Sequence, residues 1–134
     1  MMKKLFNILS IIFLSIVFIS CEKQAGEGGT STIQGKVYAK KYDGSLSILR
    51  EEFYIPDERV YIIYGDDSIY SDDFRTNYDG SYEFKYLRKG KYRIYAFSKN
   101  LDKKTSVQEI PVFVEVEITD NKQTVQATDI IIIK

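Results

Sequence analysis

Apolar and polar side chains alternate along most of the chain after residue 32, which is the pattern of β-strands with one buried face. The clearest run is residues 110–118, where every second residue is aliphatic. Turn-forming residues separate the runs, and Asp79-Gly80 is a strong hairpin signal because both residues tolerate positive φ. The pattern predicts an all-β domain, a seven-stranded antiparallel Greek-key β-sandwich. We expect strands at 33–40, 60–64, 69–76, 82–87, 92–96, 110–118 and 124–133.

The first 20 residues have a different character from the rest of the chain. Lys3 and Lys4 precede an apolar stretch that runs from Leu5 to Ser20, which is the layout of a secretory signal peptide. A helix of that length would cover about 24 Å, less than the ~30 Å hydrocarbon core of a bilayer. We therefore expect residues 1–20 to direct export rather than to span a membrane permanently.

The single cysteine of the chain, Cys21, directly follows this stretch. The sequence Phe18-Ile19-Ser20-Cys21 resembles the lipobox of bacterial lipoproteins, although Phe18 stands where an aliphatic residue is usual. The resemblance implies that residues 1–20 are a lipoprotein signal peptide and that the Cys21 thiol carries acyl chains such as palmitate. Acyl chains would hold the protein on a membrane. A lone cysteine in an exported protein also has no disulfide partner within its own chain.

Residues 21–32 are rich in glycine and contain no large aliphatic side chain, which predicts a flexible tether before a sandwich domain at 33–134. The residue after the cysteine is Glu22, whereas an aspartate there resembles an inner-membrane retention signal. The expected location is therefore the bacterial cell envelope, with the lipid anchor in the outer membrane.

Composition removes several classes of function. The chain has 19 basic and 19 acidic residues and no histidine. Without histidine it has no Ser-His or Cys-His pair, and we expect neither enzyme activity nor a cofactor. No basic run provides the electrostatic footprint of a protein that binds nucleic acid. Removing residues 1–20 takes away Lys3 and Lys4 and no acid, so the mature protein would be mildly acidic.

The spacing of turn and core residues in the middle of the chain is distinctive. The positions concerned are Thr76, Asp79, Gly80, Tyr82, Phe84, Leu87, Gly90, Tyr92, Ile94 and Ala96. They resemble the signature of carboxypeptidase regulatory-like domains, which are prealbumin-like sandwiches similar to the collagen-adhesin (Cna) B-type repeats. The resemblance implies a prealbumin-like or immunoglobulin-like fold. It also implies a scaffolding or recognition role without an active site.

Some apolar residues lie on the face of their strand that should point away from the core. Two arrangements would explain this. Residues 41–55 form a long apolar connection, in which Leu46, Leu49 and Phe53 could lie on one side of a short helix that covers the outward face. Alternatively, the outward residues form an exposed binding patch. The Ile130–Ile133 run leaves the same two possibilities. The outward set is Tyr61, Ile63, Tyr95, Phe97 and Phe113.

Two functions follow from these expectations. The preferred one is an exported, membrane-anchored lipoprotein whose non-catalytic sandwich binds another envelope protein or acts as a scaffold. The alternative is a carbohydrate-binding surface lipoprotein that uses exposed tyrosines as stacking platforms for a polysaccharide. The lack of tryptophan disfavours the alternative.

Aspartates supply a weak candidate metal site. Asp66, Asp67, Asp72 and Asp73 carry the hard oxygen ligands that Ca²⁺ prefers. Their spacing matches no EF-hand loop, and aspartate is common in turns for conformational reasons. We therefore expect no bound metal.

Overall fold

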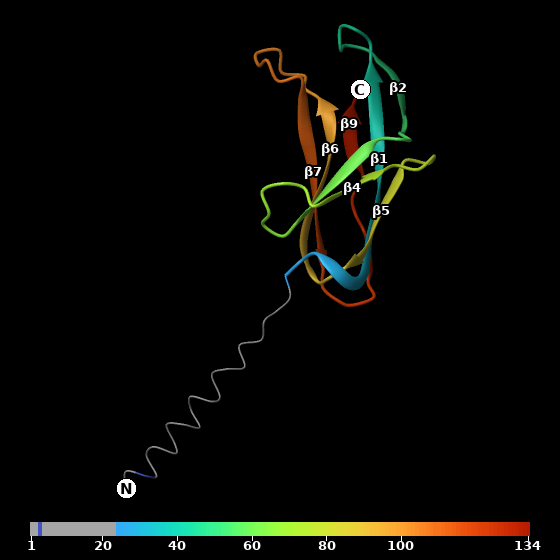
Figure 1. Cartoon of the computed structure of the whole chain (residues 1–134). Coiled ribbons are helices and arrows are strands. Elements are labelled where there is room, and N and C mark those ends of the chain that lie inside the picture. Colours follow the sequence, from blue (N-terminus) through green and yellow to red (C-terminus); the bar gives the residue numbers. More distant parts are fainter. Residues whose placement is uncertain (1–2, 4–23) are drawn as a thin grey trace.

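The computed structural model describes Lys3 and residues 24–134, and its strands form two sheets (Figure 1). Apart from Lys3, the predicted signal peptide and Cys21 lie outside the described residues. No described helix is long and apolar enough to cross a membrane. Within residues 24–134 the strands are β1 (Glu27–Tyr42), β2 (Leu49–Tyr54), β3 (Arg59–Tyr64), β4 (Asp72–Arg75), β5 (Ser81–Leu87), β6 (Gly90–Lys99), β7 (Glu109–Ile118), β8 (Thr124–Gln126) and β9 (Ile130–Ile133).

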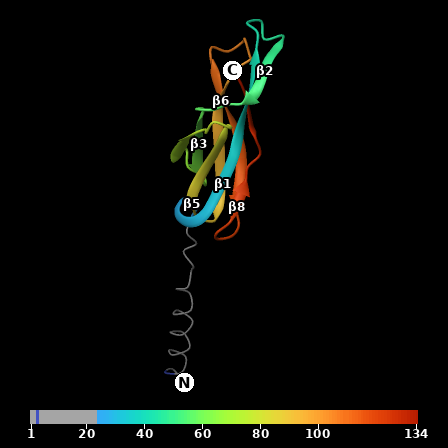
Figure 2. The same ribbon diagram turned by 90° about the vertical axis from the view of Figure 1, so that its right-hand side faces the viewer.

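The first sheet is built around β1, which pairs with different strands along its length. Its earlier part pairs with β5 in an antiparallel sense and with β8 in a parallel sense. Its later part pairs with β2 in an antiparallel sense and with β9 in a parallel sense. Figure 2 shows β1 running between β5 and β8, with β2 at its far end. The prediction of a wholly antiparallel sandwich is therefore wrong for β8 and β9.

The second sheet is wholly antiparallel and has the order β4-β3-β6-β7. β6 and β7 pair over ten consecutive positions, from Gly90 opposite Ile118 to Lys99 opposite Glu109. β3 lies on the other side of β6, with Tyr61 opposite Tyr95. This continuous register places one row of side chains on each face of the sheet.

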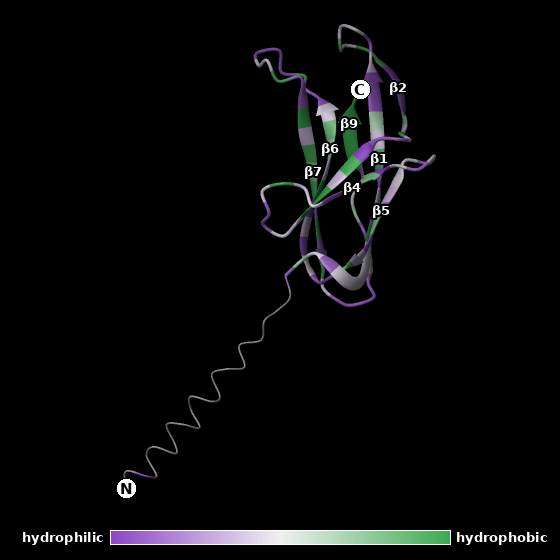
Figure 3. Ribbon diagram, in the orientation of Figure 1, coloured by the Kyte–Doolittle hydropathy of each residue, from purple (hydrophilic) through white to green (hydrophobic). Residues whose placement is uncertain are grey.

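The core lies between the two sheets and consists of the inward members of the alternating runs. The prediction that alternate apolar residues of the strands form the core is confirmed. Figure 3 shows apolar and polar residues alternating along the strands. The buried set is Ile33, Val37, Ala39, Val60, Ile62, Tyr82, Phe84, Leu87, Tyr92, Ile94, Ala96, Val116, Ile118, Ala127, Ile130 and Ile132.

Three strand predictions differ from the structure, which has nine strands in its described part rather than seven. Residues 49–54 form β2 instead of a helix, and residues 124–133 form two short strands. Residues 27–32, expected within a tether, are the start of β1. Glycine is required there because a Cβ on Gly29 would collide with the backbone carbonyl of Leu87 on β5.

Two tyrosines, Tyr82 on β5 and Tyr92 on β6, organise the core in different ways. Tyr82 lies opposite Gly35 on β1, and its ring fills the space that a side chain at Gly35 would occupy. Tyr92 accepts a hydrogen bond from the Gly26 N–H (2.9 Å) and donates one to the Arg88 carbonyl (2.6 Å). The Tyr92 hydroxyl therefore ties the start of β1 to the turn between β5 and β6.

Two further residues of the predicted signature, Gly80 and Thr76, stabilise connections between strands. Gly80 has a φ of 75°, and its N–H donates to the Asn77 carbonyl (2.9 Å), so the predicted tight turn is present. The predicted hairpin is wrong, because the strands on either side of this turn, β4 and β5, lie in different sheets. The Thr76 hydroxyl donates to the Ile55 carbonyl (2.6 Å) and accepts from the Glu58 N–H (2.9 Å). Thr76 thus fixes the connection between β2 and β3 from within the sandwich.

Candidate functional site

The outward face of the β4-β3-β6-β7 sheet carries a group of neighbouring aromatic rings. Tyr61 and Tyr95 lie opposite each other, with ring centroids 4.9 Å apart. Tyr95 lies opposite Phe113, at 5.0 Å, and Phe97 contacts both tyrosines at 5.7 and 5.5 Å. The structure therefore brings together four of the five residues of the predicted outward set.

A fifth ring comes from the loop between β3 and β4, which spans residues 65–71. The Tyr70 ring packs edge-on against Tyr61, with centroids 4.9 Å apart. Sequence reasoning missed Tyr70, although the apolar pair Ile69-Tyr70 within a run of Asp and Ser residues was an available signal. We call Tyr61, Tyr70, Tyr95, Phe97 and Phe113 the aromatic cluster.

The prediction for Ile63 is wrong, because its side chain is only 5% exposed. Ile63 lies opposite Arg93 on β6, and the Arg93 guanidinium donates a hydrogen bond to the Asp67 carbonyl (2.7 Å). This bond holds the 65–71 loop against the end of the sheet where Ile63 lies.

The predicted cover over this face is also wrong. Residues 49–54 pair with β1 in the other sheet, so they do not lie over the aromatic cluster. The partial cover comes instead from the 65–71 loop, through Tyr70. A surface of about half-exposed rings remains, since Phe113 and Tyr70 are each 48% exposed.

The orientation of the rings limits what this surface can bind. Tyr61 and Tyr95 are nearly parallel, with an interplanar angle of 15°, so one face of each ring packs against the other ring. Tyr95 is only 9% exposed. Burial raises the pKa of Tyr95, and the neighbouring phenols of Tyr61 and Tyr70 raise it further. Tyr95 therefore stays neutral near neutral pH. Because it is buried, it offers a sugar no free ring face to stack on.

Charged side chains lie at both ends of the aromatic cluster on the same face. Towards one end, Lys91 lies opposite Glu117 and Arg93 opposite Glu115. Towards the other end, Lys99 lies opposite Glu109. The surface consequently has an uncharged aromatic centre with charged residues of both signs at its two ends, the general layout of a protein interface.

The aspartates considered for Ca²⁺ are not brought together. Asp73 forms an ion pair with Arg59 (3.4 Å), and Asp72 accepts a hydrogen bond from the Asp73 N–H (2.8 Å). Among residues 24–134, no group of three acidic or thiol side chains is placed to hold a metal ion. The weak candidate set Asp66, Asp67, Asp72 and Asp73 therefore does not form a site.

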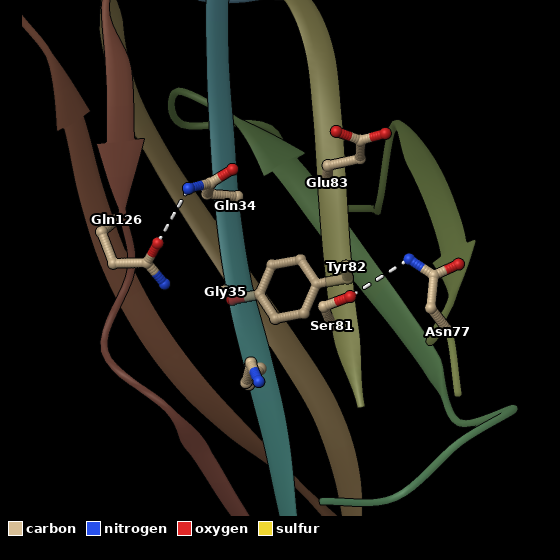
Figure 4. Close-up of a pocket in the computed structure, with 8 residues that line it drawn as sticks. Gln34, Gly35, Asn77, Ser81, Tyr82, Glu83 and Gln126 are labelled. Atoms are coloured by element: carbon tan, nitrogen blue, oxygen red, sulfur yellow. Dashed lines mark hydrogen bonds between the residues drawn. The ribbon is translucent and has the colours of Figure 1, made fainter. Parts of the chain in front are cut away.

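A separate pocket of about 280 Å³ lies on the outward face of the first sheet, and polar side chains from β1, β5 and β8 line it (Figure 4). Gln34 donates a hydrogen bond to Gln126 (3.0 Å), and Asn77 donates one to Ser81 (3.1 Å). Lys36 forms an ion pair with Asp79 (3.5 Å). Most of the polar groups of this pocket are thus already engaged with one another.

Comparison with known proteins does not assign the chain to a family. No family model matches the chain, and no curated protein matches it significantly. The chain is similar to a crystal structure from Pseudomonas aeruginosa described as "a putative carbohydrate binding protein", with 15% identity and a TM-score of 0.49. The similar region covers 82% of this chain and 92% of that one.

Proposed function

We propose that the chain is a non-catalytic binding module of the cell envelope that recognises another protein through the aromatic cluster. The observation that carries the proposal is the half-exposed pair Phe113 and Tyr70 beside the packed rings of Tyr61 and Tyr95. Burying such rings against a partner removes apolar surface from water, and aromatic residues in the centre of an interface contribute most of its binding energy.

The charged rows at both ends of the cluster support a protein partner over a polysaccharide. Interfaces between proteins combine an apolar centre with a polar rim, whereas a stacked sugar needs an exposed ring face. Tyr61 and Tyr95 stack on each other, so the ring faces between them are not available to a sugar. The aromatic cluster therefore fits protein side chains better than it fits a sugar ring.

A photo-reactive phenylalanine analogue at position 113 of the full chain tests this proposal in intact cells. We expect irradiation to attach a second protein to position 113, because Phe113 is the aromatic residue of β7 and its ring is half-exposed. The same analogue at Tyr78, which is 99% exposed but lies in the turn before β5, serves as the matched control. Equal products from positions 113 and 78 would contradict the proposal.

The polar pocket on the first sheet favours a second candidate, a saccharide. Its amide, hydroxyl and carboxylate groups are the kinds that bind sugar hydroxyls. Retention of the full chain on a polysaccharide that is lost in Gln126→Ala and kept in Phe113→Ser would support this candidate. Retention that is lost in Phe113→Ser and kept in Gln126→Ala would contradict a protein partner at the aromatic cluster.

We further propose that Cys21 carries the lipid that holds the module on the outer membrane. The support is the apolar segment that ends at Ser20 and the single thiol that follows it. The intact mass of the protein extracted from membranes is expected to equal residues 21–134 plus acyl groups. A Cys21→Ser variant should lack the added mass and appear in the soluble fraction. An unmodified thiol at Cys21 in the membrane-extracted protein would contradict the anchor.

A further inference from the structure

β7 is an edge strand that exposes apolar side chains on both of its faces. Among the described residues it pairs only with β6. On its outward face Phe113 is half-exposed, and on its inward face Ile110 is 40% exposed while Val112 and Val114 are partly buried. Val116, further along the inward face, is buried. The first half of β7 therefore carries partly exposed apolar side chains on both of its faces.

The free side of β7 also presents backbone groups. In an antiparallel pair, the N–H and C=O groups of alternate residues point away from the partner strand. On an edge strand these groups are ready to pair with another strand, and natural proteins guard them with proline or charged side chains. Pro111 guards one position, but residues 112–118 contain no proline. A second strand could pair with β7 along this segment.

The charge of the outward face indicates what such a strand should carry. Lys91, Arg93 and Lys99 form a row of cations on β6, and the acids opposite them form a row on β7. Within residues 24–134, Glu109, Glu115 and Glu117 make no ion pair closer than 4.0 Å. A strand added outside β7 meets this acidic row directly, so cations on the added strand would continue the alternation of charge.

A second copy of the chain is less well matched than a basic segment. If two β7 strands paired antiparallel about Phe113, Glu109 of each would lie opposite Glu117 of the other. Like charges directly opposite each other destabilise a strand pair. The acidic row thus disfavours this self-pairing and favours a partner of opposite charge.

We propose that β7 binds an extended, basic segment of the partner protein by strand addition, a proposal that rests on the proposed function. In an antiparallel arrangement the segment carries Lys or Arg opposite Glu117, Glu115 and Glu109. It carries apolar side chains opposite Phe113 and Pro111. Backbone hydrogen bonds supply affinity and the alternate side chains supply specificity, as in other cases of β-augmentation. The apolar side chains of the segment cover the exposed ring of Phe113.

Synthetic peptides that span the length of Glu109–Glu117 test this proposal by fluorescence anisotropy with the full chain in detergent micelles. One peptide carries lysine opposite the three glutamates and valine opposite Phe113 and Pro111. Its matched control carries glutamate in place of lysine. We expect the lysine peptide to bind and the glutamate peptide to bind about tenfold or more weakly. Methylating the backbone nitrogens that face β7 should abolish binding, and methylating the alternate set should not.

Variants of the protein test whether the glutamates of β7, rather than the overall negative charge of the protein, produce the preference for the lysine peptide. The double variant Glu115→Gln, Glu117→Gln should lose most of the preference for the lysine peptide. The double variant Glu51→Gln, Glu52→Gln on β2 removes the same charge from the other sheet and should keep the preference. Equal binding of both peptides, or equal effects of both methylation patterns, would overturn the proposal.

The outcome also distinguishes this proposal from the proposed function. If position 113 captures a protein in cells but neither peptide binds, strand addition fails and the binding module stands. If position 113 captures a second copy of the chain, the basic-segment proposal fails. If position 113 captures no protein at all, the proposed function itself fails.

Discussion

Tyr92→Phe is expected to lower the free energy of unfolding by about 1–3 kcal/mol, while Tyr82→Phe leaves it unchanged or raises it slightly. Both side chains are 1% exposed, so each change deletes one hydroxyl oxygen from a buried tyrosine. The Tyr92 hydroxyl is paired with the Gly26 N–H and the Arg88 carbonyl. Removing it leaves the buried Gly26 N–H and the partly buried Arg88 carbonyl without this partner. The Tyr82 hydroxyl has no hydrogen-bond partner among the described residues, so its removal breaks no bond.

Urea denaturation of both variants beside the parent chain measures this difference. Burial is the main cause that raises the pKa of both tyrosines, so neither carries charge near neutral pH and both variants are compared there. A loss of stability in Tyr82→Phe as large as that in Tyr92→Phe would show that the Tyr82 hydroxyl has a partner that this account does not include.

Gly35→Ala is expected to destabilise the sandwich by about 1–3 kcal/mol, although alanine normally suits a strand better than glycine does. A Cβ at Gly35 would overlap the Tyr82 hydroxyl and lie 2.6 Å from Tyr82 Cζ. The Tyr82 ring is fully buried between the sheets, so it cannot move aside without disturbing the core. The thermal midpoint of the variant should therefore fall.

Gly44→Ala is the matched control for this substitution. A Cβ at Gly44 meets no atom within 4 Å, and the residue lies in the loop before β2. Its effect on stability should stay within about 0.5 kcal/mol. Equal thermal midpoints for Gly35→Ala and Gly44→Ala would contradict the packing of Tyr82 over Gly35.

Alternation predicted the strands that have one buried and one exposed face. β3, β6 and β7 are of this kind, and the turn at Asp79-Gly80 was predictable because Gly80 tolerates the positive φ that it adopts. β2 was not predictable in this way, since most of its residues are exposed on both faces and its charged residues break the pattern. The start of β1 was missed because its glycines, which suggest flexibility in a sequence, are needed there for close approach to β5.

The candidate site was largely predictable for a related reason. Apolar residues at outward positions of adjacent strands must meet on one face. The parity of a residue, meaning whether it takes an odd or an even place along its strand, was therefore enough to group Tyr61, Tyr95, Phe97 and Phe113. Parity does not reveal which loop folds back over that face. The contribution of Tyr70 depends on the 65–71 loop, and only the three-dimensional structure shows this contact and the burial of Ile63.

The central claim, that the aromatic cluster binds a protein, is tested most directly by identifying what a photo-reactive residue at position 113 captures in intact cells. Mass spectrometry of the digested adduct is predicted to find peptides of another protein joined to residues 109–118, and no such peptides when the probe is at position 78. A saccharide joined to position 113, or the same products from both positions, would contradict the claim.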